Sequence, residues 1–276
     1  MDLRRFIALF IFLLFNTLAL HAQPKLILGI FPYTDALQII KTHQPLREHL
    51  ENELNVSIEV YTANSFEQFF KDTQNGLFDI LIAPPHFSPI HIESGFVPLV
   101  RYNRFLVPIF VVKKESSFMK PLDFKDKTVA LSNYLSISSI SGLTELSLAG
   151  LVVNENVKTI NTKTHAAAVQ SVLFGESDGA ITTHTALKQM ESNFDISDVR
   201  FIESSLKIPH LFTLASPKLN AKECETLKKV LLHFEQSEAG KAFFSQTGYF
   251  GYVEPTQADY ELLEPFVKEA KKILKQ

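Results

Sequence analysis

The chain has 276 residues, with 27 lysines and arginines against 30 aspartates and glutamates and a formal net charge of −3. Hydrophobic residues make up 46% and charged residues 21%, a composition that is typical of a folded globular protein and excludes a disordered or collagen-like chain. The near-neutral charge gives no basic stripe for nucleic acid, and the single cysteine, Cys224, excludes an intrachain disulfide and a multi-cysteine metal site.

Residues 1–22 are typical of a secretory signal peptide. Arg4 and Arg5 give a positive start, residues 6–20 are apolar at all but two positions, and the small residue Ala22 ends the segment. A transmembrane anchor is the alternative, but a span needs about 20 apolar residues and this run is shorter. We therefore expect export to a bacterial periplasm, with cleavage after Ala22. No cysteine stands directly after this cleavage site, so we expect no lipidation.

After residue 22, short apolar runs alternate with segments of helical periodicity. The first half predicts strands at 26–31, 56–61, 79–83, 96–102 and 106–112, and helices at 35–54 and 65–76. After a polar connector at 113–127, the second half predicts strands at 128–131, 157–160, 179–182, 200–202 and 211–215, and helices up to 150 and at 164–175, 186–190, 223–235, 239–245 and 256–275. This alternation favours an α/β fold of two lobes, each a mainly parallel sheet flanked by helices.

We predict that residues 23–112 begin lobe 1, that residues 113–204 form lobe 2, and that residues 205–276 return to lobe 1. The chain would cross between the lobes at 111–113 and at 204–209. The helical tail has no predicted strand after residue 215 and needs a lobe to pack against, for which the first is the natural host. A ligand cleft then lies between the lobes, at the carboxyl ends of strands.

The serine-rich segment after the strand at 128–131 is the most informative part of this cleft. Ser136, Ser138 and Ser139 open a helix there, and His165 opens the next helix. Helix N-termini carry unpaired N–H donors and favour anions, and hydroxyl or imidazole groups add further donors. Helix capping alone is the alternative explanation of the serines.

Other candidates follow predicted strands of the two lobes. Tyr33, His86, Phe87 and Tyr102 come from the first lobe, and Thr183 comes from the second. Tyrosines can cover a ligand with a ring and a hydroxyl, although half-buried structural tyrosines are common. A structural role is as plausible as ligand contact for His86.

Several motifs, in order and spacing, resemble the periplasmic substrate-binding proteins of phosphate/phosphonate-type ABC transporters (PhnD-like). They are GIFP at 29–32, GLFDI at 76–80 with APPHF at 83–87, LDFKDKTVA at 122–130, and HAAAV at 165–169 followed by GESDGA at 175–180. The resemblance implies a type II two-lobed clamp in which Tyr33, Phe87, Tyr102, the serine segment and His165 line the cleft. The Ser-Thr-Ser-Gly turn of the family's phosphonate binders is replaced by SISG at 139–142, and Phe87 replaces a frequent tyrosine.

We therefore expect a protein that captures a small oxyanion, of the phosphate, phosphite or phosphonate class, for an inner-membrane ABC permease. A ligand-sensing clamp for a membrane signalling partner, or a binder of a non-phosphorus ligand, is the alternative. An enzyme is disfavoured because the sequence has no glycine-rich phosphate loop, nucleophile elbow or two-histidine zinc motif. We expect no cofactor or metal, no nucleic-acid partner, and a monomer.

Overall fold

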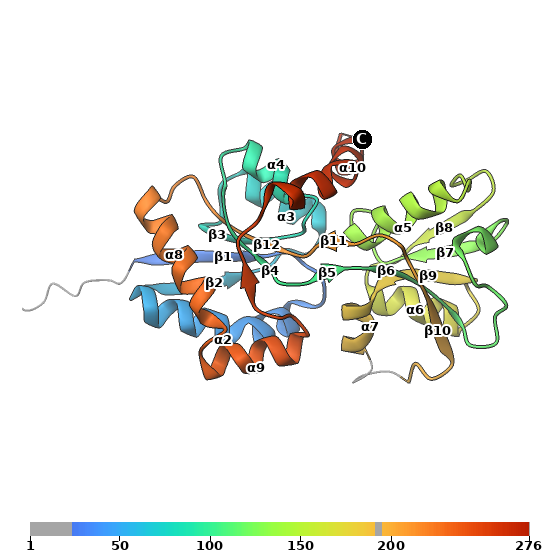
Figure 1. Ribbon diagram of the computed structural model, residues 1–276, viewed down its shortest axis with the longest axis horizontal. Coiled ribbons are helices and arrows are strands. Elements are labelled where there is room, and N and C mark those ends of the chain that lie inside the picture. The colour runs from blue at the N-terminus through green and yellow to red at the C-terminus, as the bar shows by residue number, and fades with distance from the viewer. Residues whose placement is uncertain (1–23, 191–194, 276) are drawn as a thin grey trace, which may run out of the picture.

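The chain folds into two lobes joined by a narrow connection (Figure 1). The computed structural model describes residues 24–190 and 195–275, so the expected signal peptide at 1–22 lies outside the described residues. Each lobe is built around a β-sheet with helices packed against it, as the sequence predicts (Figure 1).

The first sheet has six strands in the order β13-β4-β12-β3-β1-β2. The second has five strands in the order β10-β6-β9-β7-β8. The strands of the first sheet are β1 (Lys25–Ile30), β2 (Ser57–Tyr61), β3 (Ile80–Ala83), β4 (Val97–Tyr102), β12 (Phe212–Ala215) and β13 (Tyr252–Val253). Those of the second are β6 (Pro108–Lys113), β7 (Thr128–Leu131), β8 (Lys158–Asn161), β9 (Gly179–Thr183) and β10 (Val199–Glu203).

Most strands of each sheet point in the same direction. In each sheet the strand that arrives from the other lobe runs against them, and in the first sheet the short strand β13 does so too. β12 pairs antiparallel with both β3 and β4, and β6 pairs antiparallel with both β9 and β10. The strands β1, β2 and β3, and likewise β7, β8 and β9, are mutually parallel. The sequence pattern predicts the shared direction but not the inserted strand, because antiparallel strands can be just as apolar as their neighbours.

The two crossings between the lobes lie side by side as a short antiparallel ribbon. β5 (Phe105–Leu106) pairs with β11 (Ile208–Pro209). The first crossing therefore precedes the predicted position at 111–113, and β6, which the sequence analysis assigned to lobe 1, belongs to the second sheet. β6 is apolar at every position except its last, Lys113, and would suit either sheet, so its sequence does not reveal its partners.

Helices cover both sheets, and side-chain caps start several of them where the sequence predicts. Ser65, Ser136 and Thr164 each accept a hydrogen bond from a first-turn N–H group. None of the helices in the described ranges is long and apolar enough to cross a membrane. The helices are α2 (Ala36–Leu54), α3 (Phe66–Gln74), α4 (Ser88–Glu93), η1 (Pro121–Phe124), α5 (Ile137–Leu148), α6 (His165–Leu173), α7 (His184–Met190), α8 (Ala221–Phe234), α9 (Glu238–Thr247) and α10 (Gln257–Ile273).

The tail of the chain packs on the first lobe and also reaches the second. α8 contacts α2 and β4, and α9 contacts α2. The short strand β13, which the sequence analysis did not predict, extends the first sheet beside β4. α10 lies against α4 and β11 and touches α5 of the second lobe (Figure 1).

The second sheet buries both of its faces, because residues along its strands alternate between two cores. In β6, Phe110 and Val112 enter one core, while Ile109 and Val111 enter the other. This period of two is the expected pattern for a sheet covered on both sides.

The core of the first lobe extends across the connection into the second lobe. Leu135, Ile137 and Ile140, which belong to the loop after β7 and to α5, are buried together with first-lobe side chains. The His86 ring nitrogen Nε2, from the loop after β3, lies 2.9 Å from the Leu135 carbonyl oxygen and donates to it. The lobes are therefore in direct contact along this seam, which we define as Leu135, Ile137, Ile140 and His86.

A buried ion pair fixes α10 to the first sheet. The Arg101 Nε lies 2.9 Å from Asp259 Oδ2, and the two residues are only 9% and 3% exposed. Asp259 also accepts from the backbone N–H and the hydroxyl of Thr256 at the start of α10. One carboxylate thus both caps the helix and neutralises a buried guanidinium.

We predict that Asp259→Ala destabilises the protein by about 3–5 kcal/mol, because it leaves the Arg101 charge buried without a partner. The exposed pair between Lys271 and Glu93 also holds α10 and provides the control. Lys271→Met should cost at most about 1 kcal/mol, since solvent screens such pairs. Chemical unfolding followed by circular dichroism measures both, and equal costs for the two variants would contradict the prediction.

Three histidines of the first lobe are buried and held neutral. Burial lowers the pKa of His43 to about 4, and lowers the pKa of His86 and of His91 to about 3. In the unfolded chain the ordinary histidine pKa is about 6.5, so the unfolded state takes up protons first as the pH falls. Their contribution to stability is therefore complete above about pH 6.5 and declines as the pH falls toward 3–4.

We predict that the free energy of unfolding decreases between pH 7 and pH 4.5, with each such histidine contributing up to about 1.4 kcal/mol per pH unit. His91→Leu should make this dependence shallower, and at pH 7 it should cost little because His91 Nε2 has no hydrogen-bond partner among the described residues. Urea unfolding at several pH values tests this. The exposed His233→Leu is the control, and an equal change of slope in both variants would contradict the prediction.

Candidate ligand-binding site

A cavity of about 730 Å³ lies between the lobes. Its wall comes from both of them, mainly from loops at the carboxyl ends of strands and from the helix starts that follow. The lining segments include residues 31–35 after β1, 132–133 after β7, 136–138 at the start of α5, 163–166 at the start of α6, 183 at the end of β9 with 185–186 in α7, and 210–211, 246–247 and 249 of the returning tail. This is the place where open α/β sheets bind ligands.

The start of α5 brings a cluster of serine hydroxyls to the cavity. Ser136 caps the helix by accepting from the Ser139 N–H at 3.2 Å. Its hydroxyl lies 3.0 Å from those of both Ser132 and Ser138, and these three serines line the cavity. The first N–H groups of a helix have no carbonyl partner within it, so this wall offers backbone and hydroxyl donors together.

The start of α6 brings an imidazole to the same cavity. The His165 Nδ1 lies 2.9 Å from the Thr182 hydroxyl, which fixes the ring and leaves Nε2 for another partner. Burial lowers the His165 pKa to about 4, so the ring is neutral at pH 7. Two helix N-termini with neutral donors therefore face one cavity, an arrangement that favours an anion.

The first lobe contributes polar groups from the segment after β1 and from α2. Gln38 Nε2 donates to the Thr42 hydroxyl at 3.1 Å, and Tyr33, Gln38 and Thr42 all line the cavity. Burial raises the pKa of the Tyr33 phenol far above its ordinary value, so the hydroxyl keeps its proton. Tyr33 can therefore donate a hydrogen bond to a ligand held by the opposite lobe.

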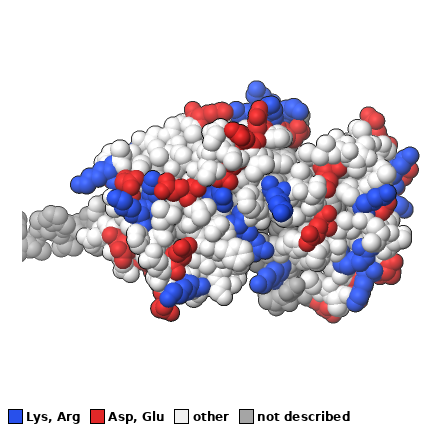
Figure 2. Space-filling view, viewed as in Figure 1, with Lys and Arg blue, Asp and Glu red and all other residues white. Residues whose placement is uncertain are grey.

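Charged groups around the cavity are few. Among the lining residues that the structure describes, the charges are those of Asp35, Lys163 and Lys188. The Asp35 carboxylate is already occupied as the cap of α2, where it accepts from the Gln38 N–H. Over the face drawn in Figure 2, residues of both signs are interspersed on both lobes.

Five of the nine candidates from the sequence line the cavity: Tyr33, Ser136, Ser138, His165 and Thr183. That they bind a ligand stays a prediction. The other four, His86, Phe87, Tyr102 and Ser139, are buried and are not among the lining residues.

The four buried candidates are held in place by other contacts. His86 bonds across the seam to Leu135, and its ring packs on Phe87 with centroids 4.3 Å apart. Tyr102 is enclosed by other tyrosines, with the Tyr249 ring centroid at 4.4 Å. The Ser139 hydroxyl accepts a 2.8 Å hydrogen bond from the hydroxyl of Ser136, the residue that caps the helix. A position after a strand is therefore not enough to bring a side chain to the cavity.

The sequence analysis did not select several polar residues of the wall. Ser132 adjoins the serine segment and could have been included as the first residue after its strand. His210 directly follows the second crossing, whose position was predicted, but its place at the cavity depends on how the tail returns. The other unselected polar or charged lining residues are Thr34, Asp35, Gln38, Thr42, Asn133, Lys163, Thr164, Thr185, Lys188, Gln246, Thr247 and Tyr249.

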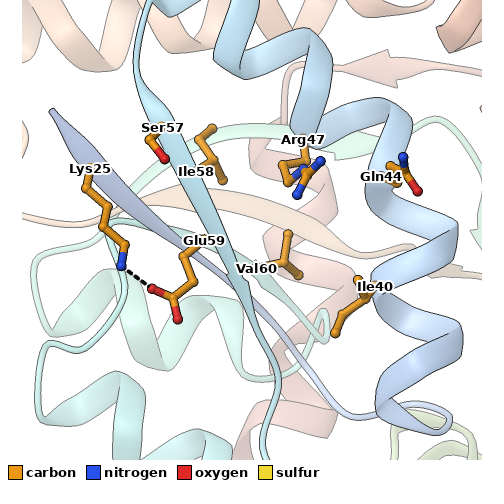
Figure 3. A pocket seen from close by; sticks show the side chains of 8 residues that line it. All are labelled: Lys25, Ile40, Gln44, Arg47, Ser57, Ile58, Glu59 and Val60. Atoms are coloured by element: carbon orange, nitrogen blue, oxygen red, sulfur yellow. Dashed lines mark ion pairs between the residues drawn. The ribbon is translucent and has the colours of Figure 1, made fainter. Parts of the chain in front are cut away.

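A second hollow, of about 580 Å³, lies on the outside of the first lobe (Figure 3). It is bounded by α2 and by the adjacent strands β1 and β2, of which β2 is the edge of the sheet. Its charged groups pair with neighbours, Lys25 with Glu59 and Arg47 with Glu51. The interlobe cavity, where two helix starts and residues of both lobes converge, is therefore the candidate site.

Solved structures with the same fold include binding proteins of phosphonate transporters. PhnD1 from Prochlorococcus marinus, solved with methylphosphonate, has a TM-score of 0.78 and 14% identity, covering 91% of this chain and 98% of that one. A binding component of an ABC phosphonate transporter from Pseudomonas aeruginosa has a TM-score of 0.77 and 12% identity, covering 91% and 89%. A Xanthomonas citri protein bound to ATP has a TM-score of 0.74 and 14% identity, covering 90% and 98%.

At these identities the solved structures establish the type II clamp fold alone. No curated protein matches the chain in sequence. The family itself is established by a model described as "ABC transporter, phosphonate, periplasmic substrate-binding protein", which matches residues 28–260 and thus well over half of the chain. The chain belongs to the family of periplasmic substrate-binding proteins of phosphonate ABC transporters.

Proposed function

We propose that the interlobe cavity binds the oxyanion group of a small phosphonate, or of phosphate or phosphite, and that closure around it presents the ligand to an ABC permease. Family membership makes the chain a transporter substrate-binding protein rather than an enzyme, with a small-molecule ligand and a membrane permease as partner. The observation that supports the oxyanion is the convergence of two helix starts, α5 and α6, on one cavity.

The donors at these helix starts suit a doubly charged oxyanion. Ser136, Ser138, Thr183 and His165 supply neutral donors from the second lobe, and Tyr33 closes over the ligand from the first. Neutral donors stabilise an anion without the large desolvation cost of burying a second full charge. The ligand contacts both lobes only when they are shut, so binding shifts the population toward the closed form.

We predict that Ser138→Ala and His165→Ala weaken binding of methylphosphonate by about 10- to 100-fold, since a hydrogen bond to a charged group contributes about 1.5–3 kcal/mol. A thermal-shift screen of phosphate, phosphite, phosphonates, sulfonates and carboxylates first identifies the best ligand, and calorimetric titration then compares the variants.

The matched control for these variants is Ser141→Ala. Ser141 lies on the same helix, but its hydroxyl bonds to the Ile137 carbonyl at 2.6 Å and it does not line the cavity. Its replacement should leave affinity unchanged. Unchanged affinity in both site variants, or no thermal shift with any of the screened anions, would overturn the oxyanion site.

We propose further that residues 1–22 are removed on export, that the mature chain is unlipidated, and that it acts as a monomer without nucleic acid. The cleavage is supported by the order of features in residues 1–22, which have a positive start, an apolar middle and a small last residue. The absence of lipidation is supported by the position of Cys224, which is buried in α8 and far along the chain from the cleavage site. Intact mass of periplasmic protein should correspond to a chain that begins at Gln23. A mass that includes residues 1–22 would contradict this prediction.

A further inference from the structure

The imidazole of His210 is an unassigned polar group in the wall of the cavity. His210 lies between β11 and β12, where the chain enters the first sheet after its second crossing, and it lines the cavity beside Leu211 and Tyr249. Its Nδ1 accepts the Leu211 N–H at 2.9 Å. An N–H group can only donate, so Nδ1 carries no proton and the ring proton is on Nε2.

The Nε2–H of His210 has no partner among the described residues. His210 is 5% exposed, and its Nε2 is shielded from solvent without any hydrogen bond. A buried donor that stays unpaired costs about 1–3 kcal/mol, so native proteins rarely leave one without a purpose. The residue is also fixed in place, since the backbone N–H of His210 donates to the Arg104 carbonyl at 3.2 Å and the Tyr249 ring packs edge-on against the imidazole with centroids 4.8 Å apart.

The charge around His210 disfavours a cationic neighbour. Burial, aided by the charge of Arg104, lowers the pKa of His210 to about 3, so the ring is a neutral donor at pH 7. The one carboxylate among the described lining residues is that of Asp35, which caps α2. An ammonium group beside His210 would find no acceptor on the ring and a positive guanidinium nearby.

The cavity also has more room than a bare oxyanion needs. Its volume of about 730 Å³ is in the range of sites that enclose organic ligands of moderate size. The donors for the oxyanion belong to the second lobe, whereas His210 belongs to the segment that enters the first. A substituent on phosphorus would therefore extend from the second-lobe donors toward the first-lobe wall.

We propose that His210 is a specificity-determining residue whose Nε2–H donates to a hydrogen-bond acceptor on the organic substituent of the ligand. The site then selects phosphonates whose substituent ends in a carboxylate or hydroxyl oxygen and disfavours those that end in an ammonium. This inference rests on the proposed binding of the phosphonate group by the second lobe.

The test compares three ligands and two variants by calorimetric titration. Methylphosphonate has no acceptor on its substituent, phosphonoacetate ends in a carboxylate, and 2-aminoethylphosphonate ends in an ammonium. In His210→Asn, the amide oxygen can replace Nδ1 as acceptor of the Leu211 N–H, but no donor reaches the Nε2 position. In His210→Gln, the longer amide restores a donor near that position.

We expect the unsubstituted protein to bind phosphonoacetate at least about 10-fold more tightly than 2-aminoethylphosphonate, a difference of about 1.4 kcal/mol. His210→Asn should weaken phosphonoacetate binding by about 10-fold and change methylphosphonate binding by less than about twofold. His210→Gln should recover most of the lost affinity for phosphonoacetate.

The proposal is overturned if the unsubstituted protein prefers 2-aminoethylphosphonate, or if His210→Asn leaves phosphonoacetate unchanged. Equal weakening of methylphosphonate and phosphonoacetate by both variants also overturns it, because that outcome indicates a structural role. If methylphosphonate binds and Ser138→Ala weakens it, a negative result at His210 leaves the proposed function standing. If none of the three ligands binds, this inference fails, and the proposed function fails with it only if phosphate and phosphite do not bind either.

Discussion

The double crossing between the lobes is the constraint on which the rest of the structure depends. Because β5 and β11 pair as one ribbon, the chain enters each sheet from the side of the cleft. The entering strand, β6 or β12, must then run away from the cleft and against its neighbours. Apart from the short strand β13, the other strands direct their carboxyl ends toward the cleft, and so α5 and α6, which follow β7 and β8, begin there. The meeting of two helix N-termini at one cleft is thus a consequence of the topology.

The sequence was sufficient for the elements and the fold class but not for the pairing of every strand. Apolar runs and the caps at Ser65, Ser136 and Thr164 carry local information, and the structure has strands and helices there. The position of the first crossing was wrong because β6 buries every residue except its last, Lys113. Such a strand satisfies the core of either lobe, and only long-range pairing with β9 and β10 decides between them.

The candidate site shows the same division between local and long-range information. The serine segment and His165 could be predicted because a helix start has a recognisable sequence and a known electrostatic character. His86 and Tyr102 follow strands in the same way, yet neighbouring rings and backbone groups enclose them. His210 carries no motif at all. The role proposed for it depends on the Leu211 N–H, which fixes the tautomer, and on the route of the returning tail.

The seam formed by Leu135, Ile137, Ile140 and His86 has a consequence for the separation of the two lobes. Separating the lobes there would return three buried apolar side chains to water and break the bond between His86 and the Leu135 carbonyl. These contacts hold the two lobes together without any ligand. A motion that separates the lobes at the seam has to break them, whether the cavity is filled or empty, so their free energy enters the opening equilibrium equally for every ligand. The seam thus bears on how readily the lobes part, whereas any choice between ligands depends on the side chains that line the cavity.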